Sequence, residues 1–208
     1  MANLSFLHRY EPGTAPGRRP LLLLHGTGGD ETDLLPVGRL VAPGAPLLSP
    51  RGQVLEHGMP RFFRRLSEGV FDEADVRRRA LDLAAFVQEA KSAYGIESPV
   101  AVGFSNGANI AAALLMLQPE ILAGAALLRA MAPLSNPPDV DLSGKPVLML
   151  SGNLDPIVPP ASASALAGQL ERAGATLRLQ TVPGGHGLTQ TDLALTQRWL
   201  DDTPDVPV

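Results

Sequence analysis

The 208-residue sequence contains no cysteine. This absence excludes disulfide bonds, thiolate metal ligands and a cysteine nucleophile, and it is consistent with a reducing compartment. An excess of basic residues is absent too, because 17 lysines and arginines stand against 21 aspartates and glutamates, giving a net charge of −4. Such a chain has no global field that attracts nucleic acid or an anionic membrane, so neither is expected as a partner.

Long apolar runs are also missing. A membrane-spanning helix needs about 18 consecutive apolar residues, and the nearest candidate, 109–131, is interrupted by Gln118, Pro119 and Glu120. The N-terminal stretch "MANLSFLHRYEPG" has no basic segment followed by an apolar core, which is the pattern of a secretory signal. We therefore predict a cytoplasmic protein without a membrane span.

The residues that are present predict a globular chain. Hydrophobic residues make up 45% of the sequence and charged residues 18%, which is typical of folded domains. A chain of this length can bury a sizeable core. We predict a single domain over 1–208, with a frayed tail at 203–208.

Short apolar runs alternate with longer helical patterns along the chain. Because apolar residues follow one another without interruption in the short runs, they predict strands covered on both faces, as in a parallel sheet. The predicted strands are 20–26, 45–52, 98–104, 122–128, 145–152 and 176–185. The predicted helices are 73–94 with Asp72 as its N-cap, 106–118 buried nearly all round, 159–174, and 189–202. This alternation predicts an α/β fold with a doubly wound, mostly parallel sheet flanked by helices.

Two long segments, 51–72 and 129–144, contain neither pattern. Each follows a predicted strand, and loops at the carboxyl ends of parallel strands often form ligand sites.

One serine lies where a predicted strand gives way to a predicted helix. The residues 103–107, "GFSNG", match the G-x-S-x-G nucleophile elbow, whose strained turn exposes the serine hydroxyl. Side chains at the positions of Gly103 and Gly107 would collide with neighbouring backbone. Ser105 is therefore the candidate nucleophile, and the alternative is a glycine-rich turn with an incidental serine.

A serine nucleophile needs a base, and the base needs an orienting carboxylate. The elbow motif places the acid and then the histidine after the serine in the chain. Among the four histidines only His186 follows Ser105. Asp155 directly follows a predicted strand, whereas Asp139 and Asp141 lie in a proline-rich loop, so Asp155 is the preferred acid.

The attacked carbonyl oxygen becomes negative and needs preformed N–H donors. The Asn106 N–H, next to the nucleophile, is one predicted donor. The glycine-rich segment 25–29 should supply the other, from Thr27 or from the neighbouring Gly28. His25 is expected to brace this segment rather than to act as a second base.

Other residues are predicted to contact substrate or solvent. The predicted substrate-binding residues are Gly28, Met59, Phe62, Phe63, Met131, Ile157 and Leu188. For the phenylalanines the alternative is ordinary core packing. The three arginines at 77–79 are interpreted as a solvated helix face rather than a nucleic-acid patch.

Together these motifs resemble the α/β-hydrolase superfamily and, within it, the phospholipase/carboxylesterase family, which includes acyl-protein thioesterases and small bacterial carboxylesterases. The resemblance rests on "LLLLHGTGGDE", "PRG", "GFSNGANIA", "SGNLDPIVP" and "PGGHGL", in this order over nearly the whole chain. "EHGMPRFFRR" is similar to the bacterial carboxylesterase branch.

The resemblance implies a catalytic triad of Ser105, Asp155 and His186, with oxyanion roles for Thr27 and Asn106. It also implies little or no lid, no cofactor or metal, and a homodimer. Asn106 stands where the thioesterases commonly carry glutamine, which argues against activity on protein thioesters.

We therefore predict a serine hydrolase that cleaves carboxylic esters through an acyl-enzyme. Short to medium acyl chains are expected, because 208 residues leave no room for a long apolar lid. Two alternatives remain open. One is a thioesterase or amidase that uses the same triad, and the other is a non-catalytic binding protein on a hydrolase scaffold.

Overall fold

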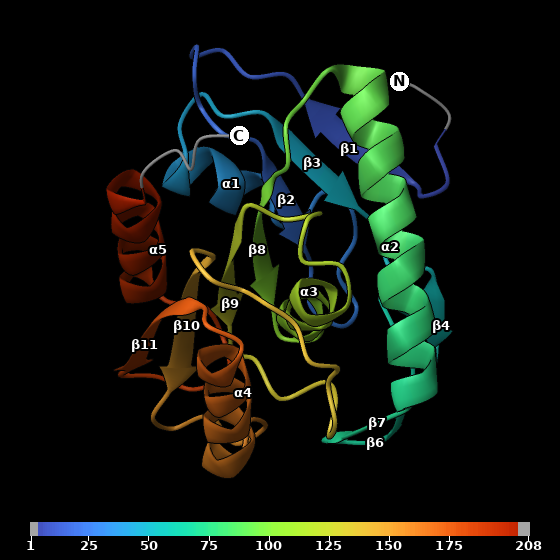
Figure 1. Ribbon diagram of the computed structural model, residues 1–208, viewed down its shortest axis with the longest axis vertical. Helices are drawn as coiled ribbons and strands as arrows, with labels where there is room; N and C mark the ends of the chain where they lie inside the picture. The colour runs from blue at the N-terminus through green and yellow to red at the C-terminus, as the bar shows by residue number, and fades with distance from the viewer. Residues whose placement is uncertain (1–3, 204–208) are drawn as a thin grey trace.

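Seven strands form one sheet at the centre of the computed structural model, which describes residues 4–203 (Figure 1). Their order across the sheet is β1-β3-β2-β8-β9-β10-β11. The strands are β1 (His8–Glu11), β2 (Leu21–Leu24), β3 (Leu47–Pro50), β8 (Val100–Phe104), β9 (Gly124–Leu128), β10 (Pro146–Gly152) and β11 (Thr176–Val182). Only β1 pairs antiparallel with its neighbour among the described strands of this sheet, so the predicted mostly parallel sheet is confirmed.

All six predicted strands are present, each shorter than predicted at one end or at both. Strand β1 was not predicted, because "HRYE" has no apolar run and pairs only at the edge of the sheet. Helix α1 (Leu35–Val41), which is only seven residues long and contains a proline and a glycine, was not predicted either. The predicted tail falls almost wholly on 204–208, which lie outside the described residues.

Helices cover both faces of the sheet (Figure 1). Helix α1 and helix α5 (Gln190–Asp202) pack on one face, and their apolar side chains share a core with alternate residues of the strands. The other face carries α2 (Glu73–Tyr94), α3 (Asn106–Leu117) and α4 (Pro160–Arg172). Helix α3 is buried on every side from Asn106 to Met116, as its lack of charged residues predicts.

The segment 51–72 folds into two small hairpins. The first pairs β4 (Val54–Glu56) with β5 (Met59–Arg61), and the second pairs β6 (Arg65–Ser67) with β7 (Val70–Phe71). Both hairpins lie over the carboxyl edge of the sheet. Hydrogen bonds to His25, Asn106 and Asp75, which belong to other parts of the chain, hold the segment there. The sequence gives no local signal for these strands because they are only two or three residues long.

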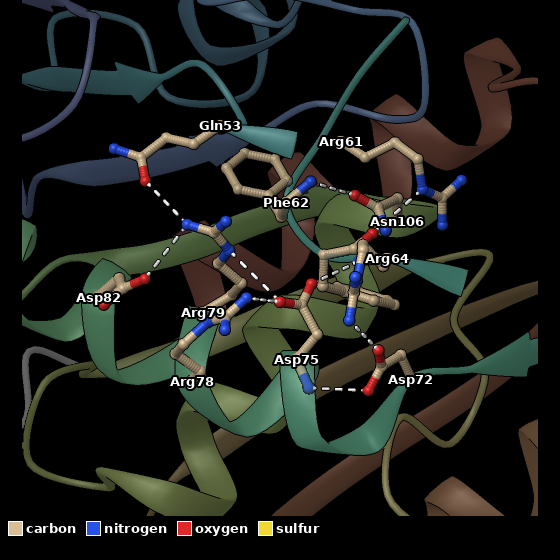
Figure 2. Close-up of polar contacts among 11 residues, drawn as sticks. Gln53, Arg61, Phe62, Arg64, Asp72, Asp75, Arg78, Arg79, Asp82 and Asn106 are labelled. Atoms are coloured by element: carbon tan, nitrogen blue, oxygen red, sulfur yellow. Dashed lines mark hydrogen bonds and ion pairs between the residues drawn. The ribbon is translucent and has the colours of Figure 1, made fainter. Parts of the chain in front are cut away.

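Helix α2 anchors the second hairpin through its first turn (Figure 2). Asp72 caps the helix as predicted, and its carboxylate accepts a bond from the Asp75 N–H at 3.1 Å. Asp75 is buried and accepts a bond from the Arg64 N–H at 2.8 Å. Arg78 and Arg79 pair with the same carboxylate, whereas Arg77 donates to the Asn136 carbonyl at 2.7 Å. Arg78 is exposed as predicted, whereas Arg79 is half-buried.

The order of the strands creates a switch point between β2 and β8. After β2 the chain moves to β3 on one side, and it then returns to β8 on the other side. In open α/β sheets a crevice forms at the carboxyl ends of such a strand pair. No helix among residues 4–203 is long and apolar enough to cross a membrane.

Candidate active site

Ser105 lies at the sharp turn between β8 and α3. Its φ of 52° and ψ of −115° are strained for a residue with a side chain. The Ser105 N–H donates to the Leu128 carbonyl at 2.8 Å, which ties the turn to β9. Since φ is positive, the hydroxyl is turned out of the chain at the edge of the sheet, as in a nucleophile elbow.

The two glycines of the motif permit this turn. A Cβ on Gly107 would lie 1.9 Å from the Leu24 carbonyl oxygen, and a Cβ on Gly103 would lie 2.6 Å from the Gly107 carbonyl oxygen. Both distances are far inside van der Waals contact with backbone that cannot move aside. The predicted need for glycine on both sides of the serine is therefore confirmed.

Three side chains that lie far apart in the sequence form one hydrogen-bonded chain. The Ser105 hydroxyl is 2.9 Å from His186 Nε2, and His186 Nδ1 is 2.8 Å from Asp155 Oδ2. The hydroxyl can donate to Nε2 while the Nδ1–H donates to the carboxylate. The Phe104 ring lies against the imidazole, with the ring centroids 5.3 Å apart. The structure thus brings together all three residues that the sequence selected.

Asp155 is suited to remain ionised. Burial raises its pKa, but the bond from His186 and those from the Ile157 and Val158 N–H groups outweigh burial, and the pKa lies below its usual value. The alternative acid Asp141 instead accepts a bond from the Ser143 N–H on the exposed surface of the protein. Within residues 4–203, the His186 ring bonds to the Asp155 carboxylate and to neither Asp141 nor Asp139.

Arg129 and Asp192 form a fully buried ion pair that sequence reasoning missed. The guanidinium binds both carboxylate oxygens, at 2.7 and 2.9 Å, and both side chains are 0% exposed. Arg129 also donates to the Gly185 carbonyl at 2.9 Å and to the Gly187 carbonyl at 3.3 Å. These are the two residues that flank His186.

The same pair also secures the start of α5. Asp192 and Thr189 form a reciprocal capping box at the N-terminus of this helix. The Thr-x-x-Asp spacing was readable from the sequence, but nothing local indicated that Arg129 would meet Asp192, 63 residues further along the chain.

The segment after β2 and the turn after β8 supply free N–H groups. Within residues 4–203 the Thr27 and Asn106 N–H groups donate to no other protein group. The Gly28 N–H donates to the Pro60 carbonyl at 3.0 Å, which leaves Thr27 as the available donor. His25 braces this segment as predicted, because its Nε2 accepts a bond from the Gly52 N–H at 2.9 Å. Burial lowers the pKa of His25, which keeps the ring neutral.

A cavity of about 320 Å³ opens beside Ser105. Its lining residues are Thr27, Arg61, Arg65, Glu68, Gly69, Phe71, Phe104, Ser105, Asn106, Asn109, Met131, Ile157 and His186. Two of the predicted substrate-binding residues, Met131 and Ile157, are among them.

The other predicted contacts lie elsewhere. Phe62 and Phe63 are 3% and 0% exposed and pack in the core beneath the hairpins, so the alternative of core packing holds for both. Leu188 packs with α5, on the face of the sheet opposite to the one that Phe62 and Phe63 cover. Met59 is 40% exposed and covers Gly28, outside the cavity lining. The prediction that these four residues bind substrate is therefore wrong. The orientation of a side chain in a loop depends on contacts with distant residues, and the sequence does not reveal those contacts.

The described residues offer no metal site. No three His, Asp or Glu side chains gather in residues 4–203 in a way that could hold an ion. The arrangement around Ser105 instead consists of a hydroxyl, an imidazole, a carboxylate and two N–H groups without protein acceptors, and this set could carry out acyl transfer.

Comparison with known proteins gives a consistent result. The family model described as Phospholipase/Carboxylesterase matches residues 10–203. MhqD, a protein of Bacillus subtilis (strain 168) named as a hydrolase, is 45% identical over 197 residues, which cover 94% of this chain and 98% of MhqD.

Two solved structures are similar over nearly their whole length. The carboxylesterase of Bacillus cereus has a TM-score of 0.94 and 42% identity, covering 97% of this chain and 96% of its own. A carboxylesterase from Mesorhizobium loti has a TM-score of 0.92 and 34% identity, covering 97% of both chains.

Proposed function

The chain belongs to the phospholipase/carboxylesterase family and is a hydrolase, and from this premise we propose that it cleaves carboxylic esters through a covalent acyl intermediate on Ser105. The observation that carries the proposal is the hydrogen-bonded chain from Ser105 through His186 to Asp155, with distances of 2.9 and 2.8 Å. These distances lie within the reach that proton transfer needs.

In the first half of the reaction Ser105 Oγ attacks the ester carbonyl while His186 Nε2 takes its proton. Asp155 holds the Nδ1–H tautomer and stabilises the imidazolium that forms. The carbonyl oxygen becomes negative, and the Thr27 and Asn106 N–H groups stabilise it. When the tetrahedral intermediate collapses, His186 gives its proton to the leaving alcohol and the acyl group stays on Ser105.

In the second half water takes the place of the alcohol. His186 accepts a proton from the water as the water oxygen attacks the acyl carbon, and the same two N–H groups stabilise the second oxyanion. Collapse then returns the proton to Ser105 Oγ and releases the carboxylic acid. The enzyme is regenerated without any external cofactor in this scheme.

The size of the cavity supports a preference for short to medium acyl chains. Its volume of about 320 Å³ matches the lower end of small-molecule sites. The elements that cover this edge of the sheet are two short hairpins, and they contribute the charged side chains of Arg61, Arg65 and Glu68 to the cavity lining. We propose that 4-nitrophenyl esters of two to six acyl carbons give higher kcat/KM than esters of twelve or more.

Hydrolysis of 4-nitrophenyl butyrate tests the proposed function directly. Wild-type protein should release nitrophenolate, and Ser105→Ala should lose about 10⁶-fold in kcat. Ser92→Ala is the matched control, because Ser92 is exposed on the distant helix α2. Equal rates for wild type and Ser105→Ala would refute the role of Ser105. The matched butyryl thioester and anilide, assayed in parallel, decide between an esterase and the thioesterase or amidase alternatives.

A further inference from the structure

Two arginines share one carboxylate at the wall of the cavity. Arg61 Nε lies 3.1 Å from Glu56 Oε2. Arg65 Nε lies 2.9 and 3.2 Å from the two oxygens of the same Glu56. Both arginines line the cavity beside Ser105. Arg61 Nε also donates to the Phe63 carbonyl at 3.2 Å, but no second carboxylate among residues 4–203 forms an ion pair with either arginine. Two guanidinium groups and one carboxylate therefore leave one unpaired positive charge in this cluster.

The position of Arg61 makes this charge significant. The residue is only 3% exposed, although guanidinium groups are rarely buried without full pairing. Burial and the nearby Arg65 lower the pKa of Arg61, and Glu56 offsets them only in part. An additional anion in the cavity would therefore stabilise the charged form of Arg61.

Arg61 is also connected to the reacting groups. Its Nη1 donates to the Thr27 hydroxyl at 2.5 Å, and the Thr27 N–H is the proposed oxyanion donor. A group bound by Arg61 would therefore lie close to the ester carbonyl that Ser105 attacks.

Asn106 adds an unused donor to the same cavity. Its Oδ1 accepts a bond from the Phe62 N–H at 2.7 Å (Figure 2). Its Nδ2 is buried and has no partner among the described residues, although Asn106 is only 2% exposed. A buried donor without a partner is costly and indicates a place for a ligand acceptor. Asn106 Nδ2 is thus a buried donor of the cavity lining that no acceptor in residues 4–203 satisfies.

The remaining acid of the lining, Glu68, does not cancel this excess. It is exposed in the turn between β6 and β7, and no ion pair joins it to Arg61 or Arg65 within residues 4–203. The charge of such a side chain is screened by water and salt. Glu68 should weaken the attraction for an anion without abolishing it.

We propose that the preferred ester carries a carboxylate group, which Arg61 and Arg65 bind while Ser105 attacks the ester carbonyl. This inference rests on the proposed function. A carboxylate fits the planar donor fork of a guanidinium. Its single negative charge matches the one unpaired positive charge, whereas a phosphate monoester brings nearly two.

Two pairs of esters of equal shape test the proposal. The first compares 4-nitrophenyl hydrogen adipate with 4-nitrophenyl adipamate, so that the carboxylate or neutral carboxamide lies in the acyl part. The second compares 4-carboxyphenyl butyrate with 4-carbamoylphenyl butyrate, so that the same groups lie in the alcohol part. At pH 7.5 we expect kcat/KM of wild type to favour the carboxylate about tenfold or more in one pair. This preference should shrink as NaCl is added.

Three variants assign the preference to the arginines. Arg65→Gln should lower the ratio of carboxylate to carboxamide about fivefold, the upper end of what an ion pair of a partly exposed side chain contributes. Glu68→Gln should raise the ratio. Arg64→Gln is the matched control and should leave it unchanged, because the Arg64 side chain is 61% exposed and bonds Asp72 at the start of α2 (Figure 2). Each ratio is internal to one protein, so a variant that folds less well does not distort it.

The outcomes separate the inference from the proposed function. Ratios near one in both pairs, or a ratio that Arg65→Gln leaves unchanged, would overturn the carboxylate preference. If the carboxamide esters are still cleaved in that case, the esterase proposal stands. If the wild type cleaves none of the four esters, both proposals fail together.

Discussion

At the scale of single residues, the proposed proton transfer depends on how tightly His186 is held in place. The imidazole bonds to Ser105 and Asp155, but its loop is fixed by Arg129, which binds the carbonyls on both sides of it. A buried ion pair is weak support for stability, while breaking it exposes an unpaired charge to the core. We therefore expect this pair to position the histidine.

Replacing Arg129 alone, or Arg129 together with Asp192, separates the effect of this ion pair on the position of His186 from its effect on the stability of the protein. Arg129→Met should lower the free energy of unfolding by about 3–5 kcal/mol, because Asp192 is left buried and charged. The double variant Arg129→Met with Asp192→Leu should regain most of that loss. It should still lose about 10²-fold in kcat with little change in KM, since nothing then holds the two carbonyls. Chemical denaturation and steady-state kinetics measure the two effects, and a double variant with wild-type kcat would contradict the positioning role.

The choice of Asp155 as the acid gives a second residue-scale prediction. Asp155→Asn should lower kcat about 10⁴-fold, because the amide cannot hold the Nδ1–H tautomer. Asp141→Asn is the matched control, as this carboxylate bonds only its own turn. Hydrolysis of a nitrophenyl ester checks both, and similar losses in the two variants would argue against the assignment.

At the scale of elements, regular segments followed from the sequence and the loops did not. Helix α2 has the predicted bounds of 73–94, because its cap and its apolar spacing are local features. The hairpins of 51–72 depend on bonds to His25, Asn106 and Asp75 from other elements. No pattern within the segment encodes those bonds, and so the cavity wall, including Arg61 and Arg65, could not be predicted.

The elbow between β8 and α3 offers a stability test at this scale. Gly107→Ala should destabilise the protein by about 3 kcal/mol or more, because the new methyl group meets the Leu24 carbonyl. Gly168→Ala is the control. Within α4 it meets only the end of the Arg172 side chain, and alanine favours a helix over glycine by about 1 kcal/mol. Thermal unfolding should separate the two variants in opposite directions, and equal shifts would contradict the close approach at the elbow.

At the scale of the whole molecule, the doubly wound, mostly parallel α/β sheet predicted from the alternation of segments is confirmed, and so is the α/β-hydrolase fold that the family resemblance implies. The three side chains selected from the sequence, Ser105, Asp155 and His186, lie together in the structure, because each follows a strand and parallel strands end at one edge. A single domain over the whole chain, a homodimer and a cytoplasmic location stay predictions. Size-exclusion chromatography with light scattering would test the homodimer.

The whole molecule should lose stability in acid for an identifiable reason. Burial raises the pKa of Asp192, but Arg129 and Thr189 outweigh it, so the pKa in the folded state lies below its usual value, as it does for Asp155. Because the pKa of each carboxylate is lower in the folded state, the unfolded chain binds protons at a higher pH than the folded chain does as the solution is acidified. The stabilisation is therefore complete above about pH 4 and is lost as the pH falls through the folded-state values.

Denaturation curves from pH 7 to pH 2 check this prediction. Wild type should show a flat free energy of unfolding near neutrality and a steep decline below about pH 4. The Arg129→Met, Asp192→Leu double variant should decline less steeply over the same range, because it lacks one of the two carboxylates. Parallel curves for the two proteins would show that Asp192 does not contribute.

The central claim, that Ser105 is an activated nucleophile, is tested most directly by intact-protein mass spectrometry after treatment with a fluorophosphonate. Attack by a serine oxygen on phosphorus expels fluoride and leaves one stable adduct. We predict a single adduct per chain on the peptide that contains Ser105, none on Ser105→Ala, and much slower labelling of His186→Ala. An adduct on a different residue, or no adduct on the folded wild type, would contradict the account.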